Sequence, residues 1–464
     1  MELETIDITS SLEIIRIMQS ASFNLSSING SQVACATVTN KGDGRYSIVS
    51  SKSFPYDTLN KDSYNTIETN EGFSFVFYNW SYSMFIHGER QEVLSFRADR
   101  IIKGNPSVQY HRAFFPKKKV KAIDFLLFES FPLELKSDRK KNYYAFGQIK
   151  CSIDGNDFYV YNFDEYLAVE CQTLLDFEQF KEDADYILEA IGFFTGVFIH
   201  DEVFFFSSDD SCFSSISCVQ YNKMTDSIQF ESFIIGREST LNKTVYPNAD
   251  IYSEKTSIIS QAVFNSLLEK LNSPKTDRHR LENILFILFY AGTYSLDTQS
   301  ICFSALFEAM RRYLETKEPR ISKSHECDRT SSDECKSFRN ALDGLFSPGE
   351  IDYYAKKCFT KRKPNQELLK ECFEIYGITL DSDDEEAIKR RDTFLHGAIP
   401  TFENVTSLDE QSRYLYALSL RQQALCYILI LKIIGYEGYI VNYRKMTKYV
   451  MSSMVDKDEC MIVI

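Results

Sequence analysis

The chain has 464 residues, of which 44% are hydrophobic and 25% charged, so we expect a globular protein with two or three domains. Its net charge of −14 excludes a protein that coats nucleic acid or anionic membrane without discrimination, and any contact with such a polyanion has to be local. Twelve scattered cysteines and an acidic N-terminus without a signal peptide's apolar core favour reduced thiols and a cytoplasmic location. The apolar runs are shorter than the roughly 20 residues of a membrane span, so we expect no membrane segment.

The first part of the chain, from about Ser22 to Val169, has strand character. Aromatic and β-branched residues alternate with polar ones between turns rich in Asn, Gly, Asp and Ser, as in residues 72–80 and 158–163. This pattern predicts a sandwich-like or barrel-like antiparallel fold. Between residues 174 and 198 the apolar residues recur at helical spacing, which predicts one amphipathic helix packed on the sheet.

The second part of the chain is helical. Composition changes between Pro247 and Glu254, so we place a β-rich domain at 1–250 and a helical domain at 251–464, with a polar insertion near 318–337. Helical periodicity predicts helices at 257–271, 281–293, 298–315, 348–359, 365–376, from 383 to 396 and from the Ser407 capping box to 435. The predicted fold class is therefore α+β, with an antiparallel β domain and an all-α bundle.

The residues from Arg391 to Gly397 are where we expect chemistry. Acids at 381–386 suit a helix N-terminus, and Gly397 followed by Pro400 suits its end. Asp392 and His396 are four residues apart and share one face of the helix, so the acid can orient the imidazole. Arg391 and His396 lie roughly 140° apart around the axis at about 100° per residue. A joint site therefore needs other helices or a second subunit, and we predict a homodimer.

Other interpretations of these residues remain open. Arg391 and His396 can be a surface arginine and a histidine that favours the helix dipole. A second match to the spacing, Arg320 to His325, lies in a polar stretch after a proline and has apolar Ile321 at its second position. His325, Cys327 and Cys335, with Cys358 or Cys372, offer zinc ligands, although no paired Cys-x-x-Cys is present.

The pattern of arginine, a polar residue, three variable residues and histidine, near the end of the penultimate helix of a C-terminal bundle, resembles the HEPN superfamily (higher eukaryotes and prokaryotes nucleotide-binding). The Phe394-Leu395-His396-Gly397 ending and the helix at 301–314 look most like the ApeA-type branch of bacterial anti-phage proteins. The resemblance implies an endoribonuclease of abortive infection that needs no metal or cofactor, with Arg391, Asp392 and His396 as catalytic residues. It also implies host RNA, tRNA in particular, as substrate and a phage-encoded protein as trigger or inhibitor, with the β domain as sensor or lid.

These residue types suit RNA cleavage, because RNA carries its own nucleophile, the 2′-hydroxyl. Lys361, Arg362 and Lys363, with Arg390, would line a track for the RNA phosphates, and the alternative is a solvated helix face. The second hypothesis for the whole chain is a non-enzymatic binding protein. Its bundle would then serve dimerisation or nucleotide binding, and its β domain would recognise a protein or a glycan.

Overall fold

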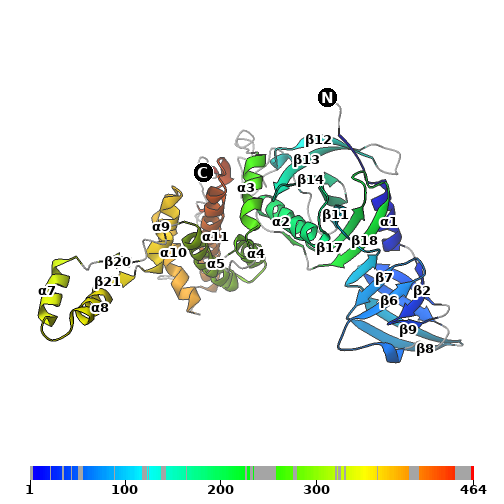
Figure 1. Cartoon of the computed structure of the whole chain (residues 1–464), viewed down its shortest axis with the longest axis horizontal. Helices are drawn as coiled ribbons and strands as arrows, with labels where there is room; N and C mark the ends of the chain where they lie inside the picture. The colour runs from blue at the N-terminus through cyan, green and yellow to red at the C-terminus, as the bar shows by residue number, and fades with distance from the viewer. Residues whose placement is uncertain are drawn as a thin grey trace. The chain divides into compact units, whose positions relative to one another are not determined.

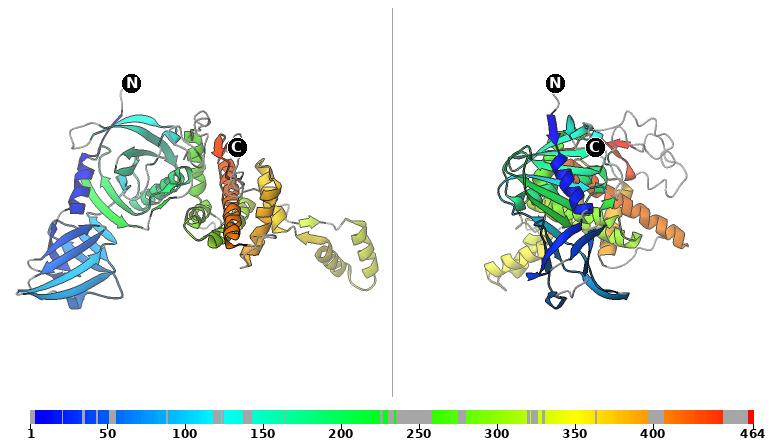
Figure 2. Two further views of the ribbon diagram at one scale, coloured as in Figure 1. Left: turned by 180° about the vertical axis from the view of Figure 1, so that it is seen from behind. Right: turned by 90° about the vertical axis from the view of Figure 1, so that its right-hand side faces the viewer.

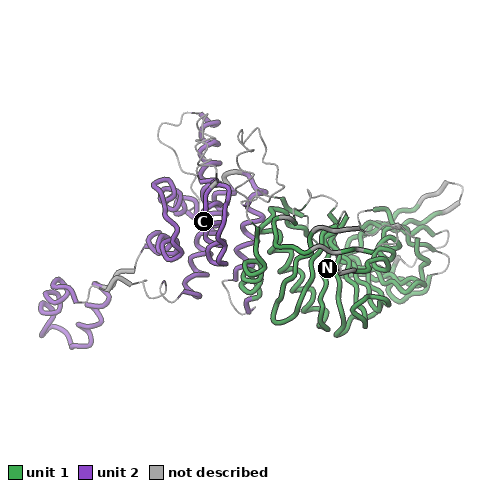
Figure 3. The backbone as a smooth tube through the Cα atoms, turned by 90° about the horizontal axis from the view of Figure 1, so that it is seen from above, with its two compact units in different colours: residues 1–232, 236–245, 256–272 green, residues 233–235, 246–255, 273–464 purple. Residues whose placement is uncertain are grey.

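The computed structural model describes residues 4–20, 22–33, 36–42, 44–50, 56–87, 89–117, 123, 125–136, 143–163, 165–224, 227–229, 234, 258–274, 280–318, 321, 326–328, 331–362, 364–396, 407–444 and 461–464. The chain divides into two compact units, coloured separately in Figure 3. Unit 1 comprises residues 1–232, 236–245 and 256–272, and unit 2 comprises residues 233–235, 246–255 and 273–464. The molecule is α+β, with a large antiparallel sheet in unit 1 and a helical unit 2, as the composition of the two parts predicts.

Seventeen strands of unit 1 pair in one continuous path. They are β1 (Glu4–Asp7), β2 (Ser22–Ile28), β3 (Ser31–Gln32), β4 (Thr37–Gly42), β5 (Arg45–Ser50), β6 (Asn65–Thr69), β7 (Ser74–Phe77), β8 (Trp80–His87), β9 (Glu89–Arg97), β10 (Arg100–Lys103), β11 (Tyr110–Pro116), β12 (Phe131–Lys136), β13 (Tyr143–Ile153), β14 (Asn156–Phe163), β15 (Tyr166–Cys171), β17 (Glu202–Ser208) and β18 (Ile216–Lys223). A short ladder of β16 (Val197–Phe198) with β19 (Ile228–Gln229) stands apart from them.

The path runs β1-β12-β13-β14-β15-β11-β17-β18-β10-β7-β6-β2-β4-β5-β9-β8, with β3 also paired to β2. Of these recorded pairings, all are antiparallel except the parallel pair of β1 with β12. The continuous path differs from the two facing sheets of the predicted sandwich. Pairing of distant strands such as β10 with β7 and β18 joins what would otherwise be separate sheets.

Helix α2 (Phe177–Thr195) confirms the helix predicted at 174–198 and lies inside the curve of strands β11–β18 (Figures 1 and 2). Its N-cap Asp176 accepts hydrogen bonds from the backbone N–H groups of Glu178 and Gln179, and Gly196 closes it in the left-handed conformation. The residues that set the helical period are all buried: Phe177, Phe180, Ala184, Ile187, Leu188 and Ile191. Strands β11, β15 and β17 are buried on both faces. Helix α2 covers one face, where Phe177 and Phe180 pack on Phe205, and the other face, with Phe114 and Phe206, belongs to the main apolar core.

Two further helices of unit 1 correct the prediction of one packed helix. Helix α1 (Thr9–Ser20) buries Ile15 and Met18 against the core of strands β2–β9 and was not predicted. Helix α3 (Gln261–Leu271) was assigned to the helical domain, yet it packs on β13 and α2 and belongs to unit 1. Asn265 on α3 accepts a hydrogen bond from the backbone N–H of Ser152, which helps to fix this helix on β13.

Unit 2 is built around one long helix, α5 (Leu296–Lys317). Its bundle helices are α4 (Leu281–Ala291), α5 (Leu296–Lys317), α9 (Asn365–Ile375), α10 (Ser382–Leu395) and α11 (Leu408–Ile433). Helix α5 contacts each of the other four, because its apolar stripe, Phe303, Leu306, Phe307, Met310 and Leu314, is completely buried. These positions match the predicted helices within a few residues. The bundle therefore confirms the helical periodicity of the second part of the chain.

The described part of the predicted polar insertion, residues 318–337, contains a short strand and the start of a helix, and the helix at Pro348–Phe359 confirms the helix predicted at 348–359. Strands β20 (Glu326–Asp328) and β21 (Thr360–Arg362) pair antiparallel, and between them lie helices α7 (Asp333–Leu342) and α8 (Pro348–Phe359). Ser332 caps α7 by accepting from the backbone N–H of Cys335. The last two strands, β22 (Tyr439–Val441) and β23 (Met461–Val463), pair antiparallel.

Among the residues that the structure describes, one helix, α11, is long and apolar enough to cross a membrane. In the most apolar 18-residue stretch of α11, 83% is buried inside the protein, as expected for a helix at the centre of a bundle.

Candidate active site

Helix α10 carries the predicted catalytic residues and is fixed at its N-terminus by ion pairs. Asp381 and Asp384 form a capping box, which confirms the predicted helix start. Arg421 of α11 donates to Asp381 (2.6 Å), Asp384 (2.9 Å) and Asp383 (3.2 Å), and Arg444 also pairs with Asp384. The acids that the sequence assigned to the helix dipole therefore also anchor α10 to α11.

The Arg391 side chain is only 1% exposed and lies between two carboxylates. Its Nε and Nη2 both donate to Oδ1 of Asp392, at 3.1 and 2.7 Å. Its Nη1 is 4.0 Å from Oε2 of Glu308, which is within ion-pair range and too long for a hydrogen bond. Among the described residues this buried Nη1 has no hydrogen-bond partner. A buried guanidinium with one unmet donor is an energetically unfavourable arrangement that an anionic ligand would relieve.

Glu308 and Arg311 of α5 lie beside Arg391. Arg311 donates to Glu308 through Nη2 (2.6 Å) and Nε (3.2 Å), and also pairs with Glu315. Burial raises the pKa of Glu308, but its hydrogen bonds and charge interactions with Arg311, aided by Arg312 and Arg391, hold that pKa below its usual range. Glu308 is therefore an ionised acceptor in this site.

Glu308 and Arg311 are not among the site residues predicted from the sequence. Both are substantially buried, and Glu308 faces Arg391. The available signal was three charged residues, Glu308, Arg311 and Arg312, beside the apolar stripe of this helix, because buried charges usually have partners.

His396 and Asp392 do not form the pair that the helical spacing predicted. His396 is exposed at the end of α10, where its backbone N–H donates to the Asp392 carbonyl at 3.1 Å. Its imidazole makes no recorded hydrogen bond to another described residue. The Asp392 carboxylate, with 55% of its side chain exposed, is engaged by Arg391. The structure therefore joins Arg391 to Asp392 and leaves the histidine facing outward.

The predicted phosphate track is divided between separate elements. Arg390 is half-buried and paired with Glu386 one turn earlier, at 2.6 Å. Lys361 and Arg362 lie on β21, opposite Cys327 and Glu326, and their side chains, like all of Lys363, are outside the described residues. The main contacts of β21 are with β20 and α8, whereas those of α10 are with α5, α9 and α11. In the described structure the track and the Arg391 site are thus on different sets of elements.

The zinc alternative has little support in the described part of unit 2. His325 and the Cys327 side chain fall outside it. Cys335 is buried in α7, Cys358 is exposed in α8, and the Cys372 thiol in α9 donates to the Leu368 carbonyl. Burial raises the pKa of Cys372 to about 12, which opposes the thiolate that zinc needs. Within the described ranges no group of three or more His, Cys, Asp or Glu could hold a metal ion.

Comparison with known proteins adds no relative, since no protein-family model, curated protein or solved structure matches the chain.

Proposed function

We propose that this protein is a metal-independent endoribonuclease whose site is formed by Arg391, Asp392 and His396 on a HEPN-type helical bundle. The observation that carries the proposal is the buried Arg391, with one unmet donor, five residues before an exposed histidine at a helix end. A guanidinium of this kind suits a phosphoryl group, because its fixed fork and permanent charge match the phosphate oxygens. By the ApeA-type resemblance, the setting would be bacterial abortive infection, with host RNA, tRNA in particular, as substrate.

The reaction would use the 2′-hydroxyl of RNA as nucleophile. His396 in its neutral form would accept the hydroxyl proton, or in its protonated form would donate to the leaving 5′-oxygen. Arg391 would bind the phosphoryl oxygens as negative charge builds, while Glu308 positions its guanidinium. The products would carry a 2′,3′-cyclic phosphate and a 5′-hydroxyl.

A second proton carrier is required, because one histidine cannot be acid and base in the same step. Glu308 does not suit the role, since its neighbouring arginines keep it ionised. His396 of a second copy is the simplest candidate, and a homodimer would then complete the site. Asp392 would restrain the resting enzyme, because its carboxylate occupies the Arg391 fork that the phosphate needs. A phage-encoded protein acting on the β-rich unit would be the trigger or inhibitor.

The test is cleavage of total bacterial RNA in EDTA by the wild type, Arg391→Ala and His396→Ala. Each substitution should lower the cleavage rate by on the order of 100-fold or more. Arg391→Lys keeps the charge and loses the fork, so it should also be slow while placing less strain on folding. Arg413→Ala, an exposed arginine on α11, is the matched control and should cleave normally.

The proposal would be supported if the wild type produces RNA fragments with cyclic-phosphate ends and the folded Arg391 and His396 variants do not. The same fragments from all variants would indicate a contaminating nuclease. Intact RNA in every sample, even with infected-cell extract added, would overturn the proposal.

The second candidate is a non-enzymatic binding protein, and a cavity of unit 1 favours it. A cavity of about 620 Å³ is lined by the single tryptophan, Trp80, with Tyr78 and Tyr82. The Trp80 indole N–H donates to the Asn60 carbonyl at 3.2 Å, which holds the ring in place for stacking on a sugar or an aromatic side chain. A binding protein would retain its biological function in a folded His396→Ala variant, whereas the ribonuclease would lose it.

A further inference from the structure

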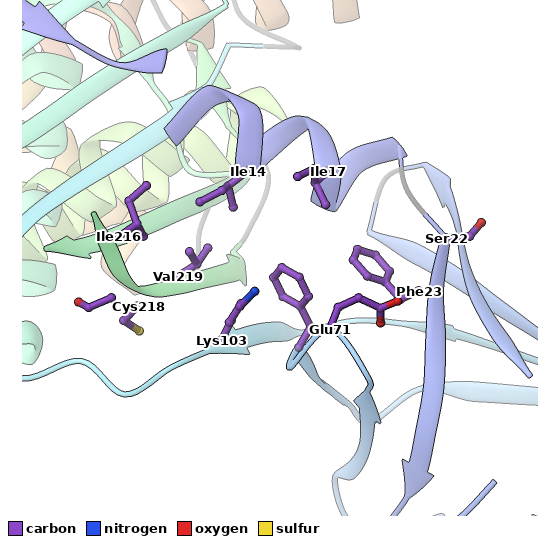
Figure 4. A pocket seen from close by; sticks show the side chains of 11 residues that line it. Ile14, Ile17, Ser22, Phe23, Glu71, Lys103, Ile216, Cys218 and Val219 are labelled. Carbon is purple, nitrogen blue, oxygen red and sulfur yellow. The ribbon is translucent and has the colours of Figure 1, made fainter. Parts of the chain in front are cut away.

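Unit 1 contains a second cavity, of about 330 Å³, beside helix α1 (Figure 4). Its volume lies at the lower end of the roughly 300–1,000 Å³ that small-molecule sites occupy. Figure 4 shows Ile14 and Ile17 on α1 facing the side of the cavity where Phe23 and Val219 lie. The lining comes from α1 and from the ends of β2, β10 and β18.

The walls of this cavity are apolar and fixed. Phe23 and Phe73 belong to the buried core and pack edge to face, with ring centroids 5.2 Å apart. Ile17 remains 42% exposed, although it lies next to this core. An apolar ligand in the cavity would cover Ile17 and extend the contact surface of the core.

Two charged side chains line the cavity, and one of them is fully engaged. Glu71 accepts hydrogen bonds from the backbone N–H of Asn24 (3.1 and 3.2 Å) and from its side-chain amide (3.0 Å). Burial raises the pKa of Glu71, but these hydrogen bonds outweigh it and the pKa is lowered. Glu71 is thus an ionised carboxylate whose charge is already stabilised by Asn24.

Lys103 is the other charge. Its Nζ lies 4.9 Å from the centre of the Phe73 ring, and among the described residues it has no recorded hydrogen bond or ion pair. The next residue, Gly104, has φ of 79°, and a Cβ there would be 2.3 Å from the Ser217 carbonyl oxygen. This close approach holds the end of β10 against β18 and so places Lys103 at the cavity.

We propose that this cavity binds a small amphipathic anion, specifically a medium-chain aliphatic carboxylate. The alkyl chain lies along Ile14, Ile17 and Phe23, and the carboxylate pairs with Lys103. The proposal does not depend on the ribonuclease assignment, because it uses residues of unit 1 only.

Binding of decanoate, decanol and decyltrimethylammonium to the full chain, measured by calorimetry below their micelle concentrations, tests the head-group preference. Decanoate should bind about tenfold tighter than decanol, because it adds a charge-assisted contact at a partly exposed site. The ammonium should bind weakest. Across a carboxylate series the affinity should rise by up to about fourfold per methylene until the cavity is full.

Three variants locate the site. Lys103→Met should weaken decanoate about tenfold and leave decanol unchanged, whereas Lys41→Met, at an exposed position outside the cavity lining, should change neither. Ile17→Trp should fill the cavity and weaken both ligands, and its exposed starting position makes unfolding a minor concern. Equal affinity for all three head groups, no measurable binding, or full decanoate affinity in Lys103→Met would overturn the proposal.

Discussion

Arg391 shows how a single side chain connects the fold to the proposed chemistry. A guanidinium that is almost fully buried has to be paired, and here Asp392 and Glu308 supply the charge while one N–H group stays unmet. In the proposed ribonuclease the same pairing would oppose catalysis, because the phosphate would have to displace the Asp392 carboxylate from the fork. The structure therefore assigns Asp392 a different partner from the histidine that the helical spacing indicated.

Asp392→Asn separates these two roles. If Asp392 competes with the substrate phosphate, the amide should raise RNA cleavage about two- to fivefold, which corresponds to loss of one partly exposed ion pair. If Asp392 instead orients His396, the same change should lower the rate. Initial rates at several RNA concentrations would distinguish the two, and Asp409→Asn on α11 is a control with a similarly exposed ion-paired carboxylate.

Asp183 on α2 is a buried carboxyl with a consequence for stability. Burial raises its pKa to about 6, despite a hydrogen bond from Gln179 to Oδ1, and Oδ2 has no hydrogen-bond partner among the described residues. Because the folded-state pKa is raised, the folded chain binds more protons than the unfolded chain between about pH 4 and pH 6. The contribution of Asp183 to the free energy of unfolding is therefore fully present below about pH 4 and is lost as the pH rises through about 6.

Asp183→Asn should therefore stabilise unit 1 at pH 8 by about 1–3 kcal/mol, with the gain shrinking toward pH 5. Denaturant unfolding at both pH values would measure it. Glu178→Gln, on an exposed face of the same helix, should show no such gain. A destabilised Asp183→Asn protein at pH 8 would contradict the assignment.

The position of helix α10 in the bundle is set by its neighbours, because its own sequence does not explain it. It is short of apolar residues, and its place in the bundle depends on partners from α11 and α5. Gln422 donates to the Ala387 carbonyl at 3.1 Å, and Arg421 binds three aspartates at the helix start. These contacts fix the orientation of the helix that carries Arg391.

Arg421→Met should destabilise unit 2 by on the order of 3 kcal/mol, because it leaves Asp384 buried with one cation fewer. Arg413→Met on the same helix removes only an exposed pair with Asp409 and should cost less than about 0.5 kcal/mol. Thermal unfolding followed by helical circular dichroism would compare them. Equal midpoints for the two variants would show that the aspartate cluster does not anchor α10.

At the scale of the whole molecule, the geometry of α10 leads to a prediction about assembly. Arg391 is buried and His396 is exposed on the same helix, so one chain does not present both groups to one phosphate. In a two-fold dimer, Arg391 of one copy can meet His396 of the other. A shared site that needs His396 of both copies should be inactive in any dimer that contains a His396→Ala chain, so an equal mixture of wild-type and His396→Ala chains should keep about a quarter of wild-type cleavage at the same total protein.

Light scattering would show whether the chain is dimeric, and cleavage by the mixed chains would test the shared site. About half of wild-type cleavage in a mixture that demonstrably exchanges subunits would instead place a complete site in each chain.

Features that depend on local periodicity and on helix caps could be predicted from the amino-acid sequence. The burial of Phe177 and Phe180 in α2, the stripe of α5 and the Asp381 cap of α10 follow from spacing along one helix. Relations between distant segments could not be predicted and became visible in the folded chain. It paired β10 with β7 and β18, placed α3 in unit 1, and brought Glu308 to Arg391 while drawing Asp392 away from His396. Those relations depend on which strands, apolar side chains and charges are buried together, and the free energy of that burial exists only in the assembled core.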